Sequence, residues 1–83
     1  MENRRKVIAI ADTLLEYYKD KCAFNVCQLC IIAGENAWEI GDTTMSCKYI
    51  MQAEKFVKRV DIERKLKQRK LWNRYRTIEA RCH

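Results

Sequence analysis

Five cysteines are the residues of this 83-residue chain whose spacing could support metal chemistry. Cys22, Cys27 and Cys30 have the spacing of the first three thiolate ligands in one common type of iron–sulfur site. Cys47 could supply a fourth ligand, and the same four thiols could instead hold zinc. Two features oppose both interpretations, because Cys27 and Cys30 fall in a segment with helical apolar spacing and no glycine opens the backbone between Cys22 and Cys30. We therefore predict no metal and no cofactor, and we expect reduced, mostly buried thiols.

The odd number of cysteines and the N-terminal sequence both favour a reducing compartment. The segment Met1–Lys6 is basic, as in a signal peptide, but the apolar run Val7–Ala11 behind it ends at Asp12 and is too short for one. The sequence also lacks the run of roughly 18 apolar residues that a spanning helix needs. We expect a cytoplasmic protein without a membrane partner, and we expect Cys82 to lie in a frayed terminus.

Residues suited to acid–base or nucleophilic catalysis are scarce. The only histidine is His83, the last residue, and no nucleophile lies near a base in the sequence. Glu35, Glu39 and Asp42 cluster in an expected loop, where carboxylates are more often helix caps or solvated groups. The sequence also lacks a glycine-rich phosphate-binding loop. We predict that the protein is not an enzyme and has no small-molecule substrate.

Positive charge is concentrated in the last third of the chain. Residues 1–54 carry 6 Lys and Arg against 8 Asp and Glu, whereas residues 55–83 carry 11 against 3. Such an asymmetry is typical of chains that bind a polyanion, and the alternative is a solvated basic face that only maintains solubility. We favour a polyanionic partner.

Apolar spacing predicts three helices within one domain that covers residues 1–83. Apolar residues recur three and four positions apart over Arg4–Lys21, which predicts the first helix. A shorter second helix is expected over Phe24–Gly34, with Gly34 as the left-handed residue that ends it. Glu35–Gly41 is expected to be a loop. The amphipathic run at about 44–58, preceded by a capping aspartate, predicts the third helix.

Two structures compete for the basic C-terminal segment. Val60 and Ile62 alternate with polar residues, and residues 71–78 are rich in Trp, Tyr, Thr and Ile, which together predict a β-hairpin with a basic tip. Alternatively the helix continues, because Glu, Arg, Lys, Leu and Gln are strong helix formers and neither glycine nor proline marks a turn. The apolar residues of the segment keep no continuous helical stripe, so we favour the hairpin over residues 59–78.

The order of helix, short helix, loop, amphipathic helix and basic hairpin resembles the winged helix-turn-helix superfamily over residues 7–78. Phe24–Gly34 is similar to the second helix of that fold, Thr44–Val57 to its recognition helix, and Arg74–Ile78 to its returning wing strand. The resemblance implies a mostly α fold with a small β-hairpin. The connection over 35–43 is longer than the tight turn usual in such proteins, and the wing lacks a tip glycine.

The resemblance implies that the helix at about 44–58 enters the major groove of double-stranded DNA and that the wing lies on the backbone. Lys48 would then reach guanine and Gln52 adenine. Thr44 and Tyr49 would touch phosphates or thymine methyl groups, and the wing cations would position the protein without reading sequence. The expected DNA-binding residues are Thr44, Lys48, Tyr49, Gln52, Lys55, Arg64, Lys65, Lys67, Arg69, Lys70 and Arg74.

Trp72 and Tyr75 lie among arginines and could form a stacking platform for single-stranded nucleic acid. Aromatic residues in this position more often cover the core. We favour the second interpretation for both residues.

The sequence as a whole favours a sequence-specific transcriptional regulator of bacterial or viral type that binds double-stranded DNA. Many such regulators are homodimers, and the candidate interface residues on the first helix are Leu14, Leu15, Tyr17 and Tyr18. The alternative is a small protein–protein interaction module, such as a phage-encoded inhibitor. Its basic part would bind an acidic host surface or mask a nucleic-acid site.

Overall fold

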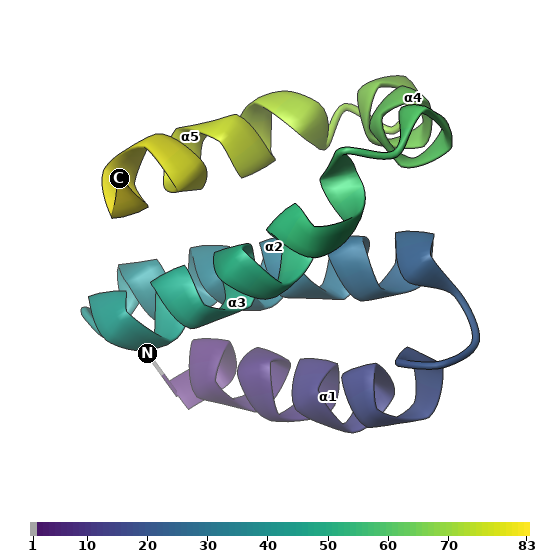
Figure 1. Ribbon diagram of the computed structural model, residues 1–83. Helices are drawn as coiled ribbons and strands as arrows, with labels where there is room; N and C mark the ends of the chain where they lie inside the picture. Colours follow the sequence, from purple (N-terminus) through teal and green to yellow (C-terminus); the bar gives the residue numbers. More distant parts are fainter. Residues whose placement is uncertain (1) are drawn as a thin grey trace.

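The computed structural model describes residues 2–83, which form five α-helices. They are α1 (Glu2–Tyr18), α2 (Ala23–Glu39), α3 (Thr43–Val57), α4 (Val60–Gln68) and α5 (Trp72–Cys82). The paired helices α2 and α3 form a central layer, with α1 on one side of it and α4 and α5 on the other (Figure 1). No strand occurs among residues 2–83, so the expected β-hairpin and the winged fold are wrong, although the mostly α class is right.

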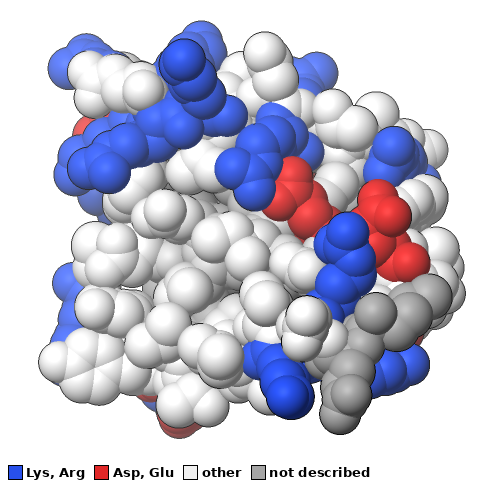
Figure 2. All heavy atoms as spheres, turned by 180° about the vertical axis from the view of Figure 1, so that it is seen from behind, with Lys and Arg blue, Asp and Glu red and all other residues white. Residues whose placement is uncertain are grey.

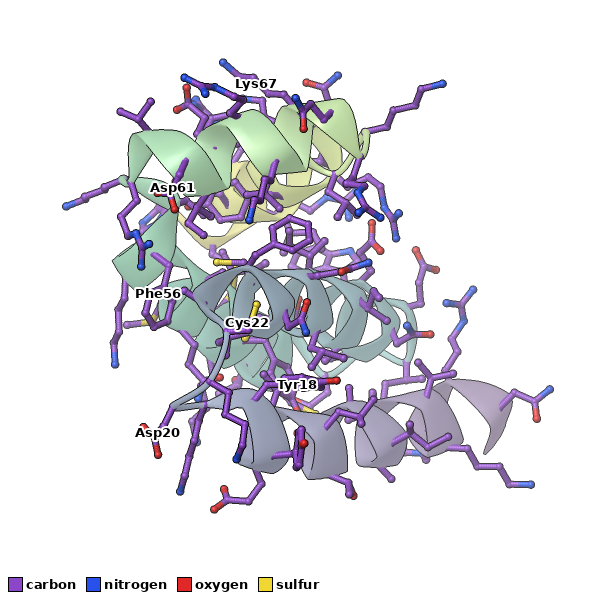
Figure 3. The ribbon with its side chains drawn as sticks, turned by 90° about the vertical axis from the view of Figure 1, so that its right-hand side faces the viewer. Tyr18, Asp20, Cys22, Phe56, Asp61 and Lys67 are labelled. Atoms are coloured by element: carbon purple, nitrogen blue, oxygen red, sulfur yellow. A yellow bond between two sulfur atoms is a disulfide. The ribbon has the colours of Figure 1, made fainter. Side chains whose placement is uncertain are left out.

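The first helix packs on α2 through one of its two apolar stripes. Ile8 and Ala11 are buried, Leu15 and Tyr18 are half-buried, and all four recur at helical spacing. Tyr18 points from α1 toward α2 in Figure 3. The expected first helix, Arg4–Lys21, therefore starts two residues late and runs three residues too far.

The second helix does not end at Gly34, as the sequence suggested, but continues to Glu39. Gly34 lies instead where α2 and α3 approach each other. A Cβ atom there would come within 3.3 Å of Ile50 Cδ1, and the hydroxyl of the buried Ser46 donates a hydrogen bond of 2.6 Å to the Gly34 carbonyl. The glycine thus permits a close approach of two helices, which a sequence pattern does not distinguish from a helix end.

The turn between α2 and α3 is made by the other glycine. Gly41 has a φ of 85°, in the left-handed region that favours glycine. Asp42 then caps α3, because its carboxylate accepts a hydrogen bond of 3.0 Å from the Met45 N–H. The third helix therefore falls within one residue of the expected 44–58, whereas the expected loop over 35–41 is mostly helix.

The predicted wing, residues 59–78, is replaced by α4 and α5, which join through a turn at Lys70. Lys70 has a φ of 60°, so the chain makes a left-handed turn without glycine. The N–H of Leu71 bonds to the Leu66 carbonyl at 2.8 Å and closes this turn. Each short helix has its own apolar stripe, and the buried residues are Ile62, Leu66, Leu71, Tyr75 and Ile78. The lack of one continuous stripe therefore reflects a turn between two helices.

A disulfide joins Cys47 of α3 to Cys82 at the end of α5, with 5.6 Å between the two Cα atoms. The expectations of reduced thiols at these positions and of a frayed Cys82 are therefore wrong. The bond connects the layer of α4 and α5 to the central layer, and its two cysteines are 35 residues apart in the chain. Among the described helices, none is both long enough and apolar enough to span a membrane.

Candidate nucleic-acid interface

The strongest charged feature is a group of exposed cations on α4 and its flanks, which we call the α4 basic surface. It consists of Lys58, Arg64, Lys65, Lys67, Arg69 and Lys70. Ile62 and Leu66 turn inward and anchor the helix, so the cations project on its remaining sides. Viewed from behind, Lys and Arg gather at the upper left, where α4 lies (Figure 2).

Most of these cations are free to meet an external anion. Within residues 2–83, only Lys67 of the six forms an ion pair, at 3.1 Å from Glu63. That pair is exposed on both sides and is therefore weak. Lys67 projects from α4 away from the rest of the molecule in Figure 3. The five remaining cations make the α4 basic surface strongly positive.

Three cations of the α4 basic surface lie over aromatic rings, which restrict the positions of their side chains. The Lys65 ammonium lies 5.8 Å from the centroid of the Phe24 ring, and the Arg69 guanidinium lies 6.0 Å from it. The Lys67 ammonium lies 5.3 Å from the Trp72 ring. A shallow hollow of about 450 Å³ is lined by Lys67, Lys70, Trp72 and Asn73.

Trp72 is half-buried and Tyr75 is fully buried, so the two aromatic residues have different roles. Tyr75 covers the core, as expected, although from a helix and not from a wing. Its hydroxyl donates to Glu79 at 3.0 Å, and burial together with this bond raises the Tyr75 pKa. Only Trp72 lies among cations at the surface.

Arg74 does not belong with the other cations. Its guanidinium donates two hydrogen bonds to Glu35 of α2, one of them 2.8 Å long, and this pair raises the Arg74 pKa. The residue lines a separate hollow between α2 and α5, together with Arg4 and Arg81. The charge of Arg74 is thus balanced, and the residue is a brace between helices.

The predicted base-contacting residues of α3 are only partly on one face. Thr44, Lys48 and Lys55 are exposed and recur at helical spacing on the outward side of the helix. Tyr49 is 9% exposed, and its hydroxyl donates to Asp12 of α1. Burial and this bond raise the Tyr49 pKa. Tyr49 therefore links α1 to α3 and is not free to meet DNA.

Gln52 is exposed but already has a partner, because its side-chain oxygen accepts a bond of 3.4 Å from the Cys30 thiol. It lies on a cleft of about 450 Å³ between α1 and α3. Apolar residues such as Leu15, Val26 and Phe56 line this cleft beside the polar ones. Of the expected base readers, Lys48 thus remains the most accessible.

The cysteines do not form the metal site that their spacing permits. Cys47 is bonded to Cys82, while Cys27 and Cys30 are fully buried. Burial raises the pKa of each of these two thiols to about 12, so both stay protonated near neutral pH. Cys27 donates instead to the Ala53 carbonyl at 3.7 Å.

One further set of potential metal ligands comes together at the end of α5. Oxygen or nitrogen atoms of Glu54, Glu79 and His83 lie within 4.8 Å of one another. Each already has a protein partner: His83 Nε2 lies 2.7 Å from Glu54, and Arg76 lies 3.0 Å from Glu79. The fixed charge of Arg76 competes with any bound cation, so the geometry describes an ion-pair cluster.

Sequence reasoning missed one member of the α4 basic surface, Lys58, because the expected third helix ends at that residue. The run of cations over residues 58–70 contained the signal for it. Trp72 packs against the core, as expected, but it stays half-buried and lies beside Lys67. No protein-family model matches this chain, and neither a curated protein nor a solved structure matches it.

Proposed function

We propose that the protein binds double-stranded DNA through the α4 basic surface. The observation that carries this proposal is a cluster of cations on one short helix and its flanks, five of which form no ion pair with the residues that the structure describes. Such a cluster neutralises phosphates and releases counterions, which is the main source of affinity for a duplex. A transcriptional role is part of the same proposal.

The shape of α4 favours backbone contact over base reading. The helix has nine residues, and its cations surround it on several sides. Long, flexible Lys and Arg side chains can follow phosphates on both edges of a groove without reading bases. Sequence preference would then come from the outward face of α3, where Lys48 can donate to guanine. Lys48 and the α4 basic surface therefore have separable roles.

The first experiment measures duplex binding by fluorescence anisotropy across a range of salt concentrations. Neutralising about five phosphates gives a slope near −4.5 in a plot of log affinity against log salt. The double variant Arg64→Gln, Arg69→Gln should flatten this slope by about 2 and weaken binding to all sequences alike. Lys48→Ala should instead relax sequence preference, by about 1–3 kcal/mol per lost base contact.

A matched control removes the same charge from another part of the molecule. Arg5→Gln with Lys19→Gln on or beside α1 lowers the net charge equally and should leave the slope unchanged. An unchanged slope in the α4 double variant would remove the α4 basic surface as the contact. If wild-type protein fails to bind any duplex at low salt, the alternative of an acidic protein partner is favoured.

A further inference from the structure

The first helix carries an apolar stripe that none of the other described helices covers. Val7, Ile10, Leu14 and Tyr17 are 37%, 59%, 38% and 58% exposed. Their spacing of three, four and three residues places all four along one line of α1, as in the seam of a two-stranded coiled coil. The stripe lies next to the buried stripe that packs on α2, so apolar residues occupy about half the circumference of the helix.

This stripe differs from ordinary scattered surface residues. Single exposed apolar residues are normal, and Met51 and Val60 are examples elsewhere on this molecule. Four aligned residues on one helix form a continuous patch of the kind that marks an interface. The lower left of the face in Figure 2, on the side of α1, shows mostly uncharged residues.

The charged residues of α1 and of the turn after it indicate which partner can pack on this stripe. The first turns of α1 carry Arg4, Arg5 and Lys6, whereas Asp12 and Glu16 lie farther along the helix and Asp20 lies in the turn that follows it. Of the two cations in that turn, Lys19 is paired with Glu16 at 2.6 Å, and the Lys21 ammonium lies 4.4 Å from the centroid of the Tyr17 ring. A second copy of α1 packed in parallel would oppose like charges, and an antiparallel copy would oppose unlike ones.

We propose that the protein forms a homodimer in which α1 packs antiparallel against α1 of a second copy. The apolar spacing is compatible with twofold symmetry, because Val7 lies opposite Tyr17 of the partner subunit and Ile10 opposite Leu14 of the partner subunit. Lys6 then approaches Asp20 of the partner subunit at each edge. Of the interface residues expected from the sequence, Leu14 and Tyr17 belong to this seam. Leu15 and Tyr18 do not, because they pack against the core.

Dimerisation through α1 leaves the proposed DNA contact open. The central layer separates α1 from α4 and α5 (Figure 1), so a partner on α1 does not cover the α4 basic surface. The dimer therefore presents two such surfaces. Self-association does not require nucleic acid, and its test is independent of DNA binding.

Sedimentation equilibrium over a wide range of protein concentrations tests the dimer. A Cys22→Ser background excludes intermolecular disulfides through the half-buried free thiol. Leu14→Glu and Ile10→Lys should each raise the dimer dissociation constant about 30-fold or more, because they place a charge in an apolar seam. Met51→Glu is the matched control, since Met51 is as exposed as Tyr17 but lies on α3, and it should leave the dimer intact.

Charge reversal tests the antiparallel orientation. Lys6→Glu and Asp20→Lys should each weaken the dimer, and the double variant should recover the wild-type dissociation constant. A chain that stays monomeric at every concentration would overturn the proposal. So would a folded Leu14→Glu variant that dimerises as tightly as wild type, or a Met51→Glu variant that dissociates equally.

Discussion

The two outer layers of this molecule lie on opposite sides of the same central layer and present different chemistry to solvent. α1 is apolar over about half its circumference, and only half of that is covered by α2. α4 buries only Ile62 and Leu66 and is charged on its remaining sides. A helix with excess apolar surface favours a protein partner, whereas a minimally anchored, highly charged helix favours a polyanion.

The two layers also differ in how they are attached. The backbone of α1 approaches only α2 among the described helices, and a hydrogen bond between Tyr49 and Asp12 connects it to α3. The outer layer of α4 and α5 contributes fully buried Leu66 and Tyr75 to the core and is tied to α3 by the disulfide. The basic segment is therefore an integral part of the fold as well as a charged surface.

The largest effect should come from the core of the α4 layer. Leu66 is 0% exposed, so Leu66→Ala should lower the free energy of unfolding by about 3–4 kcal/mol through lost burial and a residual cavity. Ile10→Ala on α1 removes a side chain that is 59% exposed and should cost less than about 1 kcal/mol in the monomer. Urea denaturation at low protein concentration measures both values.

The equilibrium slope of these transitions provides the control. An unchanged slope shows that each variant loses stability without changing the surface exposed on unfolding. Equal losses of unfolding free energy in Leu66→Ala and Ile10→Ala would contradict the difference between the two layers. They would mean that Leu66 contributes no more to the fold than an exposed side chain of α1.

Removing the disulfide should have the second largest effect. Cys47→Ser with Cys82→Ser opens a loop with a sequence separation of 35 and should cost about 2–4 kcal/mol. Hydrogen exchange should show the loss of protection in α5 before α1, because only α5 is clamped. Cys22→Ser, a half-buried thiol outside the bond, is the control. Detection of five free thiols in the unreduced wild-type protein would contradict the bond.

The first three helices could be predicted from sequence because their apolar residues repeat within one helix. The third helix was placed within one residue of its bounds, where Asp42 provides a clear capping signal. The predicted end of the second helix is five residues too early, because a glycine such as Gly34 can either end a helix or allow another helix to pack closely against it. Only the neighbour Ile50, sixteen positions away, decides between them.

The C-terminal segment could not be predicted, because its turn uses no turn residue. Lys70 adopts a left-handed conformation that glycine or asparagine usually occupies, so the break between α4 and α5 has no compositional signal. Val60 and Ile62 appeared to alternate as in a strand, yet Val60 is 72% exposed and Ile62 is buried in a helix.

The candidate site was predictable in charge but not in geometry. The cationic run gave Arg64, Lys65, Lys67, Arg69 and Lys70, which do lie together on α4 and the turn that follows it. Arg74 and Tyr49 looked equivalent to their neighbours in sequence. Their partners, Glu35 and Asp12, lie 39 and 37 residues away, a separation that local pattern does not encode.

The smallest effect should come from the end of α5, where His83 contacts Glu54. The hydrogen bond and the charge of Glu54 raise the His83 pKa above its usual value, and Glu79 contributes in the same direction. The contact therefore stabilises the fold at a pH below the unfolded pKa of about 6.5, and this stabilisation is lost as the pH rises through the folded pKa. α1 contains no histidine and has no corresponding transition.

Proton NMR of the single imidazole should give a higher pKa in wild type than in Glu54→Gln, with Glu16→Gln on α1 as the control. Equal pKa values in wild type and Glu54→Gln would show that the contact does not form in solution. α5 would then be held in place by the disulfide and by its own buried residues alone.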